Sequence, residues 1–370
     1  MALTPTITLS AVNVAAGARV SWDGQEIPTQ FVSSTRLDVT PPPADLTRLG
    51  LHRLSVNSGG VQSAIKAVQV GFDFAVNTAA ASPDRSRVYL LGSTTFSSTA
   101  RPAELAILDA ATGTIQTVLP TKIPYSNAFV GRTLAIAVSD NGQYVYIGSS
   151  SSGLVQRLNT STNAFDLEWT VATPTQDRSV AVFSLAAMAG TTESVVVHYM
   201  NADGSLLFSI YDGAQKRPLE YTATANYNVY TVWATADRAF LYAGPACWDS
   251  FDITASGFVN KDFVCRAEPD GTTSEVGARY LKIGNSTVLV SLPITSLFQI
   301  PAPPPNGFVD LSARRVYYIT GTNSPYQIWE YNLDTGEQRI RSSSSFTPNG
   351  LVPGAPGTVL VYANWIAPLP

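Results

Sequence analysis

The chain alternates apolar and polar residues over short stretches, and turn-forming residues interrupt the alternation every few positions. A two-residue period is typical of half-buried β-strands, whereas a helix repeats its apolar positions every three or four residues. The longest stretch that suits a helix, Ala44 to Leu49, would make little more than one turn. The 26 Gly and 24 Pro residues supply the turns that many short strands need. The pattern therefore predicts an all-β protein.

Residues 1–70 form a first unit of short strands. Ile7–Ser10 alternates, and the run from Ala18 to Trp22 is followed by Asp23-Gly24, a strong signal for a tight hairpin. Further strand-like runs continue to Val70, with a break at three consecutive prolines and a Ser-Gly-Gly turn between them. We expect a small β-sandwich here.

Two segments of this unit resemble IPT/TIG domains. Gly17–Val39 contains V-S-W-D-G and T-Q-F-V-S-S-T-R-L, and Gly50–Gly60 reads G-L-H-R-L-S-V-N-S-G-G. The resemblance implies an immunoglobulin-like fold for residues 1–70. The family's opening strand is compressed or missing in this sequence, so we expect an incomplete first strand. IPT/TIG domains occur in bacterial surface proteins as spacers and adhesive units, which implies an extracellular or cell-surface location.

From about residue 72 the chain repeats one pattern, an apolar strand that ends in a small or polar residue and is often introduced by a turn such as Ser82–Ser86. Seven such strands occur: Val88–Gly92, Val145–Gly148, Val196–Met200, Leu241–Gly244, Val288–Ser291, Val316–Thr320 and Val359–Ala363. With the later Asp-x-x-Thr-Gly turns, the repeat resembles YVTN-type and quinoprotein-like β-propellers. The resemblance implies a propeller over residues 71–370, with about four strands in each blade.

The number of repeated strands favours seven blades. The interval between the strands at 288 and 316 is short for a whole blade, so six blades with one irregular unit remain an alternative. A propeller ring normally closes when a terminal strand completes the last blade. We expect Phe72–Asn77 to be that strand.

Composition and charge narrow the function. Charged residues make up 14% of the 370 residues, against about 25% in typical soluble domains, and the net charge is −4. The lysines are scattered, whereas a nucleic-acid groove needs clustered cations, so we expect no nucleic-acid partner. No apolar stretch approaches the length that spans a bilayer, so we expect no membrane insertion. The N-terminus has no signal peptide, which indicates either its removal or a longer parent chain.

The two cysteines, Cys247 and Cys265, lie on either side of turn-forming residues. A hairpin would bring them side by side, so we expect a disulfide; two buried free thiols are the alternative. A zinc site would need CxxC pairs or nearby histidines, and neither motif occurs in the sequence.

Catalytic residues are scarce. His52 and His198 are the only histidines, and each lies in an apolar strand, so we expect both to be structural and predict no Ser-His-Asp or Cys-His arrangement. A lactonase-type propeller hydrolase would instead need convergent oxygen ligands for a divalent cation. The candidate carboxylates are dispersed, most of them in turns: Asp84, Asp140, Glu193, Asp237 and Asp310. We therefore expect no catalytic, metal-binding or cofactor-binding residue.

Aromatic side chains are the remaining indication of function. Trp233, Trp248 and Trp329 lie in the propeller region and are our candidates for recognition, with core packing between blades as the alternative. We expect a non-enzymatic surface protein that binds a protein or glycan on a propeller face, with self-association open. The alternatives are a metal-dependent hydrolase of lactonase type and a structural subunit of a filament or virion, in which a neighbouring copy donates the missing strand.

Overall fold

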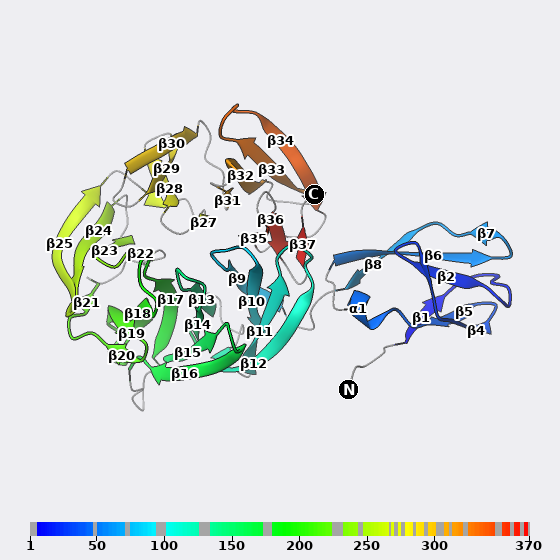
Figure 1. Ribbon diagram of the computed structural model, residues 1–370, viewed down its shortest axis with the longest axis horizontal. Helices are drawn as coiled ribbons and strands as arrows, with labels where there is room; N and C mark the ends of the chain where they lie inside the picture. Colours follow the sequence, from blue (N-terminus) through cyan, green and yellow to red (C-terminus); the bar gives the residue numbers. More distant parts are fainter. Residues whose placement is uncertain are drawn as a thin grey trace.

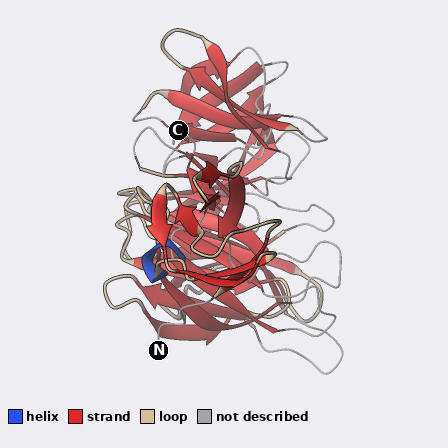
Figure 2. Ribbon diagram, turned by 90° about the vertical axis from the view of Figure 1, so that its right-hand side faces the viewer, coloured by secondary structure: helices blue, strands red, loops and turns tan. Residues whose placement is uncertain are grey.

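The computed structural model describes residues 6–46, 50–70, 75–93, 101–125, 134–172, 180–223, 232–242, 247–265, 268–269, 273–274, 278–283, 286–291, 295–300, 307–310, 313–320, 325–344, 350–355, 359–362 and 366–368. Most of these segments are β-strands, and α1 (Pro43–Leu46) is the one helix in the described part (Figure 2). It falls where the sequence tolerates a helical turn. In the part of the chain that the structure describes, no helix is long and apolar enough to cross a membrane.

The N-terminal strands form two sheets packed face to face. One sheet has the order β1-β5-β4, and the other has the order β3-β2-β6-β7 with β8 also paired to β6. Trp22, Leu37 and Val39 are almost fully buried between them. The strands are β1 (Ile7–Ser10), β2 (Arg19–Trp22), β3 (Gln25–Ile27), β4 (Thr29–Ser33), β5 (Arg36–Val39), β6 (Gly50–Ser58), β7 (Val61–Gln62) and β8 (Lys66–Val70).

An opening strand is present in this sandwich. All four residues of β1 pair with β5, from Ile7 opposite Val39 to Ser10 opposite Arg36. The first strand is therefore present but short, with four residues at the edge of its sheet, and the expectation that it is incomplete stays a prediction.

Seven further sheets follow, which we call ring sheets 1 to 7 in chain order. Their strands are, for sheet 1, β9 (Ala75–Ala81), β10 (Arg87–Ser93), β11 (Arg101–Asp109) and β12 (Ile115–Tyr125); for sheet 2, β13 (Leu134–Val138), β14 (Tyr144–Ser149), β15 (Leu154–Asn159) and β16 (Ala164–Thr170); for sheet 3, β17 (Ala181–Ala187), β18 (Ser194–Met200), β19 (Leu206–Asp212), β20 (Gln215–Lys216) and β21 (Tyr221–Thr222); for sheet 4, β22 (Val232–Ala234), β23 (Arg238–Tyr242), β24 (Cys247–Thr254) and β25 (Gly257–Cys265); for sheet 5, β26 (Glu268–Pro269), β28 (Ala278–Ile283), β29 (Ser286–Ser291) and β30 (Thr295–Ile300); for sheet 6, β27 (Thr273–Ser274), β31 (Gly307–Asp310), β32 (Arg315–Thr320), β33 (Tyr326–Asn332) and β34 (Gln338–Ser344); and for sheet 7, β35 (Gly350–Pro353), β36 (Val359–Tyr362) and β37 (Ile366–Pro368).

These sheets are arranged around a ring (Figure 1). In the first four, the first strand (β9, β13, β17 or β22) lies nearest the centre, and the later strands lie toward the periphery. The seven repeated strands predicted from the sequence fall in seven different ring sheets. They are second in the strand order of ring sheets 1, 2, 3, 4 and 7 (β10, β14, β18, β23 and β36) and third in ring sheets 5 and 6 (β29 and β32).

The repeated Val-Tyr pair explains how neighbouring ring sheets pack. Successive side chains of a strand point to opposite faces of the sheet. In ring sheet 1, Val88 joins a core with Val352 of ring sheet 7, whereas Tyr89 joins a core with Val145 of ring sheet 2. Both Val88 and Tyr89 are fully buried. Strand β10 is therefore apolar throughout because neighbouring sheets cover both of its faces.

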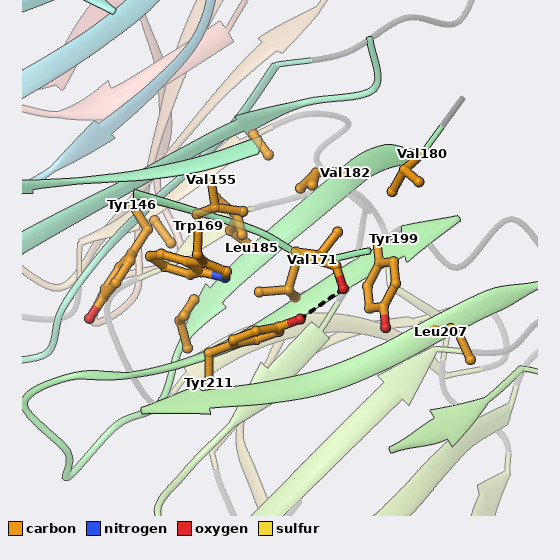
Figure 3. Packing of buried hydrophobic residues seen from close by; sticks show 14 of the residues in the cluster. Tyr146, Val155, Trp169, Val171, Val180, Val182, Leu185, Tyr199, Leu207 and Tyr211 are labelled. Carbon is orange, nitrogen blue, oxygen red and sulfur yellow. Dashed lines mark hydrogen bonds between the residues drawn. The ribbon is translucent and has the colours of Figure 1, made fainter. Parts of the chain in front are cut away.

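Figure 3 shows the core between ring sheets 2 and 3. Tyr146 and Trp169 pack edge to face, and the Tyr211 hydroxyl donates a 3.2 Å hydrogen bond to the carbonyl oxygen of Val171. Gly148, the small residue that ends the repeated apolar run in β14, is required for a steric reason. A Cβ atom on Gly148 would lie 2.9 Å from Val182 Cγ1, so the two sheets approach more closely than a side chain at this position allows.

The expected ring closure by Phe72–Asn77 is wrong for the residues that the structure describes. Residues 75–77 belong to β9, the innermost strand of ring sheet 1, and pair with β10. Residues 72–74 lie outside the described residues. Ring sheet 7 has three strands in the described part, and its last strand, β37, lies against β6 of the N-terminal sandwich.

Candidate functional site

His52 is held inside the N-terminal sandwich. Its Nδ1 atom lies 2.7 Å from Oδ2 of Asp23, and its ring stacks on Trp22 with the centroids 4.9 Å apart. Asp23 Oδ1 also accepts a 2.7 Å hydrogen bond from the Arg53 amide, at the hairpin where Asp23 has a positive φ. The histidine and the aspartate therefore fix a turn, and His52 is almost fully buried.

His198 lies between ring sheets 3 and 4. It stacks on Phe208 at 4.4 Å with the rings nearly parallel, and burial lowers its pKa to about 4, so the ring is neutral at pH 7. Ser184 is its register partner, a juxtaposition that the sequence reasoning missed. Neither the Ser184 hydroxyl nor either His198 nitrogen has a hydrogen-bond partner in the described part of the chain. These residues therefore do not form a nucleophile–base pair.

Two of the candidate metal-binding carboxylates build turns. Asp84 accepts a 2.5 Å hydrogen bond from the Ser82 hydroxyl, and this bond, with those from Ser86, holds the pKa of Asp84 below its usual range. Asp237 accepts a 2.7 Å hydrogen bond from the Thr235 hydroxyl in the corresponding turn of ring sheet 4. Both carboxylates thus stabilise the connection between the first two strands of a sheet.

The other three carboxylates link different parts of the ring. Asp140 Oδ2 accepts the amide of Gly190 at 2.9 Å. Glu193 lies 3.0 Å from Arg157, and Asp310 lies 2.7 Å from Arg85. Among the described residues, no group of three His, Cys, Asp or Glu side chains is arranged to hold a metal ion.

Four of the predicted site residues are described at the level of the backbone. Cys247 and Cys265 are direct register partners on β24 and β25, so their Cα atoms lie across from each other as a disulfide requires. Trp233 lies on β22 and Trp248 on β24. Their side chains lie outside the described part, so the disulfide and the recognition role of these two tryptophans stay predictions.

Trp329 is the predicted recognition residue whose surroundings the structure describes. It belongs to a row of three side chains that crosses ring sheet 6, because Tyr318 is its register partner on β32 and Ile340 is its partner on β34. The rings of Tyr318 and Trp329 are nearly parallel, with centroids 6.4 Å apart, and Trp329 Nε1 donates a 3.0 Å hydrogen bond to Thr320 Oγ1. This bond fixes the indole within the row.

The row becomes more exposed toward the periphery of the ring. Tyr318 and Trp329 are partly buried, and Ile340 on the outermost strand is 48% exposed. A β-bulge between Ile328 and Trp329 shifts the register beside the row. The arrangement offers an apolar, partly aromatic surface at the rim of ring sheet 6, which suits contact with a protein or with the flat face of a sugar ring.

Comparison with known proteins identifies the fold. No family model and no curated protein matches the chain. The solved structures that resemble it include U3-55K (12% identity, 81% of this chain and 96% of that chain covered, TM-score 0.50). They also include the β-propeller domain of Cps50 (Swd1) from Myceliophteria thermophila (10% identity, 79% and 95% covered, TM-score 0.52) and hydrazine synthase from Kuenenia stuttgartiensis (10% identity, 83% and 98% covered, TM-score 0.50). At these identities the likeness shows the fold alone. Together with the ring of sheets, most of which have four or five strands in the described part, it makes this chain a β-propeller protein.

Proposed function

We propose that the chain is a seven-bladed β-propeller joined to an IPT/TIG-type immunoglobulin-like domain, and that it is a non-enzymatic binding or scaffold protein. Each of ring sheets 1 to 7 would be one blade, and each contains one of the seven repeated strands. The resemblance of the first 70 residues to surface modules supports an extracellular or cell-surface location. The partner would be a protein or a glycan.

The observation that carries this proposal is the row of Tyr318, Trp329 and Ile340. A side chain that served only to fill the core would be covered, yet this row runs outward from partly buried aromatic rings to an exposed isoleucine. The side chains that chemistry would require are engaged elsewhere. Asp84 and Asp237 build turns, and His198 is buried and neutral.

The experiment is a binding screen of the whole chain on glycan and protein arrays, followed by affinity measurements on variants. We expect Trp329→Ala and Ile340→Ser to weaken binding of the captured ligand about tenfold or more, since exposed aromatic anchors dominate such contacts. Val118→Ser is the matched control, because Val118 is 41% exposed on the outermost strand of ring sheet 1. Equal losses in Val118→Ser and Ile340→Ser, or the absence of any ligand, would contradict the proposal.

Two other functions remain predictions with tests of their own. A lactonase-type hydrolase requires a tightly bound divalent cation and turnover of lactones, which elemental analysis and an activity assay measure. A filament or virion subunit requires self-association, which sedimentation at increasing protein concentration detects. We favour the binding protein over both alternatives because no group of residues in the described part of the chain supports either of them.

A further inference from the structure

Three arginines surround one buried carboxylate on ring sheet 6. Glu330 on β33 has a side chain only 6% exposed, and Arg339 Nη2 lies 2.8 Å from its Oε1 atom. Arg315 Nε and Arg341 Nε each lie 3.5 Å from a carboxylate oxygen of Glu330. The four side chains together carry two net positive charges. This charge sits at the rim of a chain whose overall net charge is −4.

The same register position in ring sheet 2 has the opposite balance of charge. Tyr146 is paired with Arg157 there, as Tyr317 is paired with Glu330 in ring sheet 6. Arg157 lies 3.0 Å from Asp166 and 3.0 Å from Glu193 of ring sheet 3, so two carboxylates share one guanidinium. In ring sheet 6 three guanidiniums lie within 3.5 Å of the carboxylate of Glu330. The net charge around Glu330 is therefore opposite in sign to the net charge at the matching position of ring sheet 2.

The arginines border both the protein core and solvent. On the core side, Tyr317 and Ile328 pack with Leu351 of ring sheet 7. Burial, together with the carboxylates of Glu330 and Asp310, raises the pKa of Tyr317 to about 12. On the solvent side, the Arg339 side chain is 62% exposed. Ring sheet 7, which faces this core, has three strands in the part of the chain that the structure describes.

Guanidinium groups bind sulfate, phosphate and carboxylate through paired, charge-assisted hydrogen bonds. The buried carboxylate of Glu330 orients the three arginines from the core side. Their surplus positive charge favours binding of a second anion from the solvent side. Nucleic acid is a poor fit, because it needs a track of cations and the lysines of this chain are scattered. We propose that Arg315, Arg339 and Arg341 form a binding site for an oxyanion group, sulfate or carboxylate, carried by an acidic glycan.

This site is separate from the row of Tyr318, Trp329 and Ile340. Trp329 and Glu330 are consecutive residues of a strand, so their side chains point to opposite faces of ring sheet 6. If one of the two binding proposals is wrong, the other can still hold, because different variants test them.

The test measures binding of a sulfated dextran oligosaccharide to the whole chain by calorimetry, with unsulfated dextran of equal length and sodium sulfate as the comparison probes. The key variant is Arg339→Gln, which removes an exposed side chain while Arg315 and Arg341 remain beside Glu330. Thermal melting checks that the variant is folded. The matched control is Arg238→Gln, which removes an exposed arginine that pairs with a single carboxylate, Asp252, at 3.3 Å. The double variant Arg315→Gln/Arg339→Gln removes two of the three cations.

We expect the sulfated oligosaccharide to bind with an affinity that falls as salt is raised. Arg339→Gln should weaken it about tenfold, the scale of one charge-assisted contact. The double variant should abolish it, whereas Arg238→Gln should leave it unchanged. Equal weakening by Arg238→Gln, full binding by the double variant, or no binding by the unaltered chain would overturn the proposal. If sodium sulfate binds as tightly per sulfate group as the sulfated oligosaccharide does, the proposal that the anion is carried by a glycan would be overturned.

Discussion

Arg85 and Asp310 form a buried ion pair, although 225 positions separate them in the sequence. Arg85 Nη1 lies 2.7 Å from Asp310 Oδ2, and their side chains are 7% and 0% exposed. Arg85 lies in the turn between β9 and β10, whereas Asp310 ends β31. Strand β35 of ring sheet 7 contacts both β9 and β31. The pair therefore joins ring sheets 1 and 6 across the sheet that closes the ring.

We predict that Arg85→Met destabilises the protein strongly. Removing one partner of a buried pair leaves an uncompensated charge, which costs about 3–5 kcal/mol in the free energy of unfolding. Urea denaturation measures this loss. Arg238→Met, at an exposed pair with Asp252, should cost about 1 kcal/mol or less. Adding Asp310→Asn to Arg85→Met should recover part of the loss, because the carboxylate is then neutral; no recovery would contradict this explanation.

The local pattern of the sequence predicts one repeated strand in each ring sheet, and the reason is physical. Val88 and Tyr89 are both apolar because each faces a neighbouring sheet, so an uninterrupted apolar run followed by Gly92 identifies the strand. The turns before these strands are equally local, since Ser82 and Asp84 bond to each other two residues apart. Such features need no knowledge of the rest of the chain.

Contacts between distant residues could not be predicted in the same way. Nothing near Arg85 in the sequence identifies Asp310 as its partner, and the mistaken closing strand at Phe72–Asn77 followed from a general rule about rings. The cluster around Glu330 was missed because its arginines come from β32 and β34, and only the register of the strands brings them together. Sequence spacing shows which residues share a strand, but the pairing of strands decides which charges meet.

We predict a disulfide between Cys247 and Cys265. The two residues are register partners, and a bond closing a loop of this size stabilises a protein by about 3 kcal/mol. Denatured, unreduced protein should show no reactive thiol, and reduced protein should show two. Reduction and the double variant Cys247→Ala/Cys265→Ala should lower the free energy of unfolding equally. Two reactive thiols before reduction would exclude the bond.

Gly148 should resist substitution because of Val182 in the neighbouring sheet. A Cβ atom at this position would lie 2.9 Å from Val182 Cγ1 and 3.3 Å from its Cβ, so Gly148→Ala should cost about 1–3 kcal/mol through overpacking. Chemical denaturation of a double-mutant cycle with Val182→Ala provides the test. We expect the double variant to be more stable than the sum of the two single losses implies. Strict additivity would show that the close contact is not the cause.

His198 should make the protein less stable in mild acid. Burial lowers its pKa to about 4, whereas a histidine in the unfolded chain titrates near 6.5. Below about pH 6.5 the unfolded chain therefore binds a proton that the folded chain excludes, and the free energy of unfolding falls as the pH is lowered toward 4. The full loss amounts to about 3 kcal/mol, and above about pH 6.5 this contribution is constant.

The variant His198→Phe isolates this effect, since it keeps an aromatic ring stacked on Phe208 but cannot bind a proton. Urea denaturation at several pH values between about 4 and 7 should show a shallower decline for the variant than for the unaltered chain. The difference between the two curves should grow as the pH falls through this range, because titrating carboxylates such as Asp212 contribute equally to both. Parallel curves would mean that His198 is protonated in the folded protein as readily as in the unfolded chain, and that its burial has no electrostatic consequence.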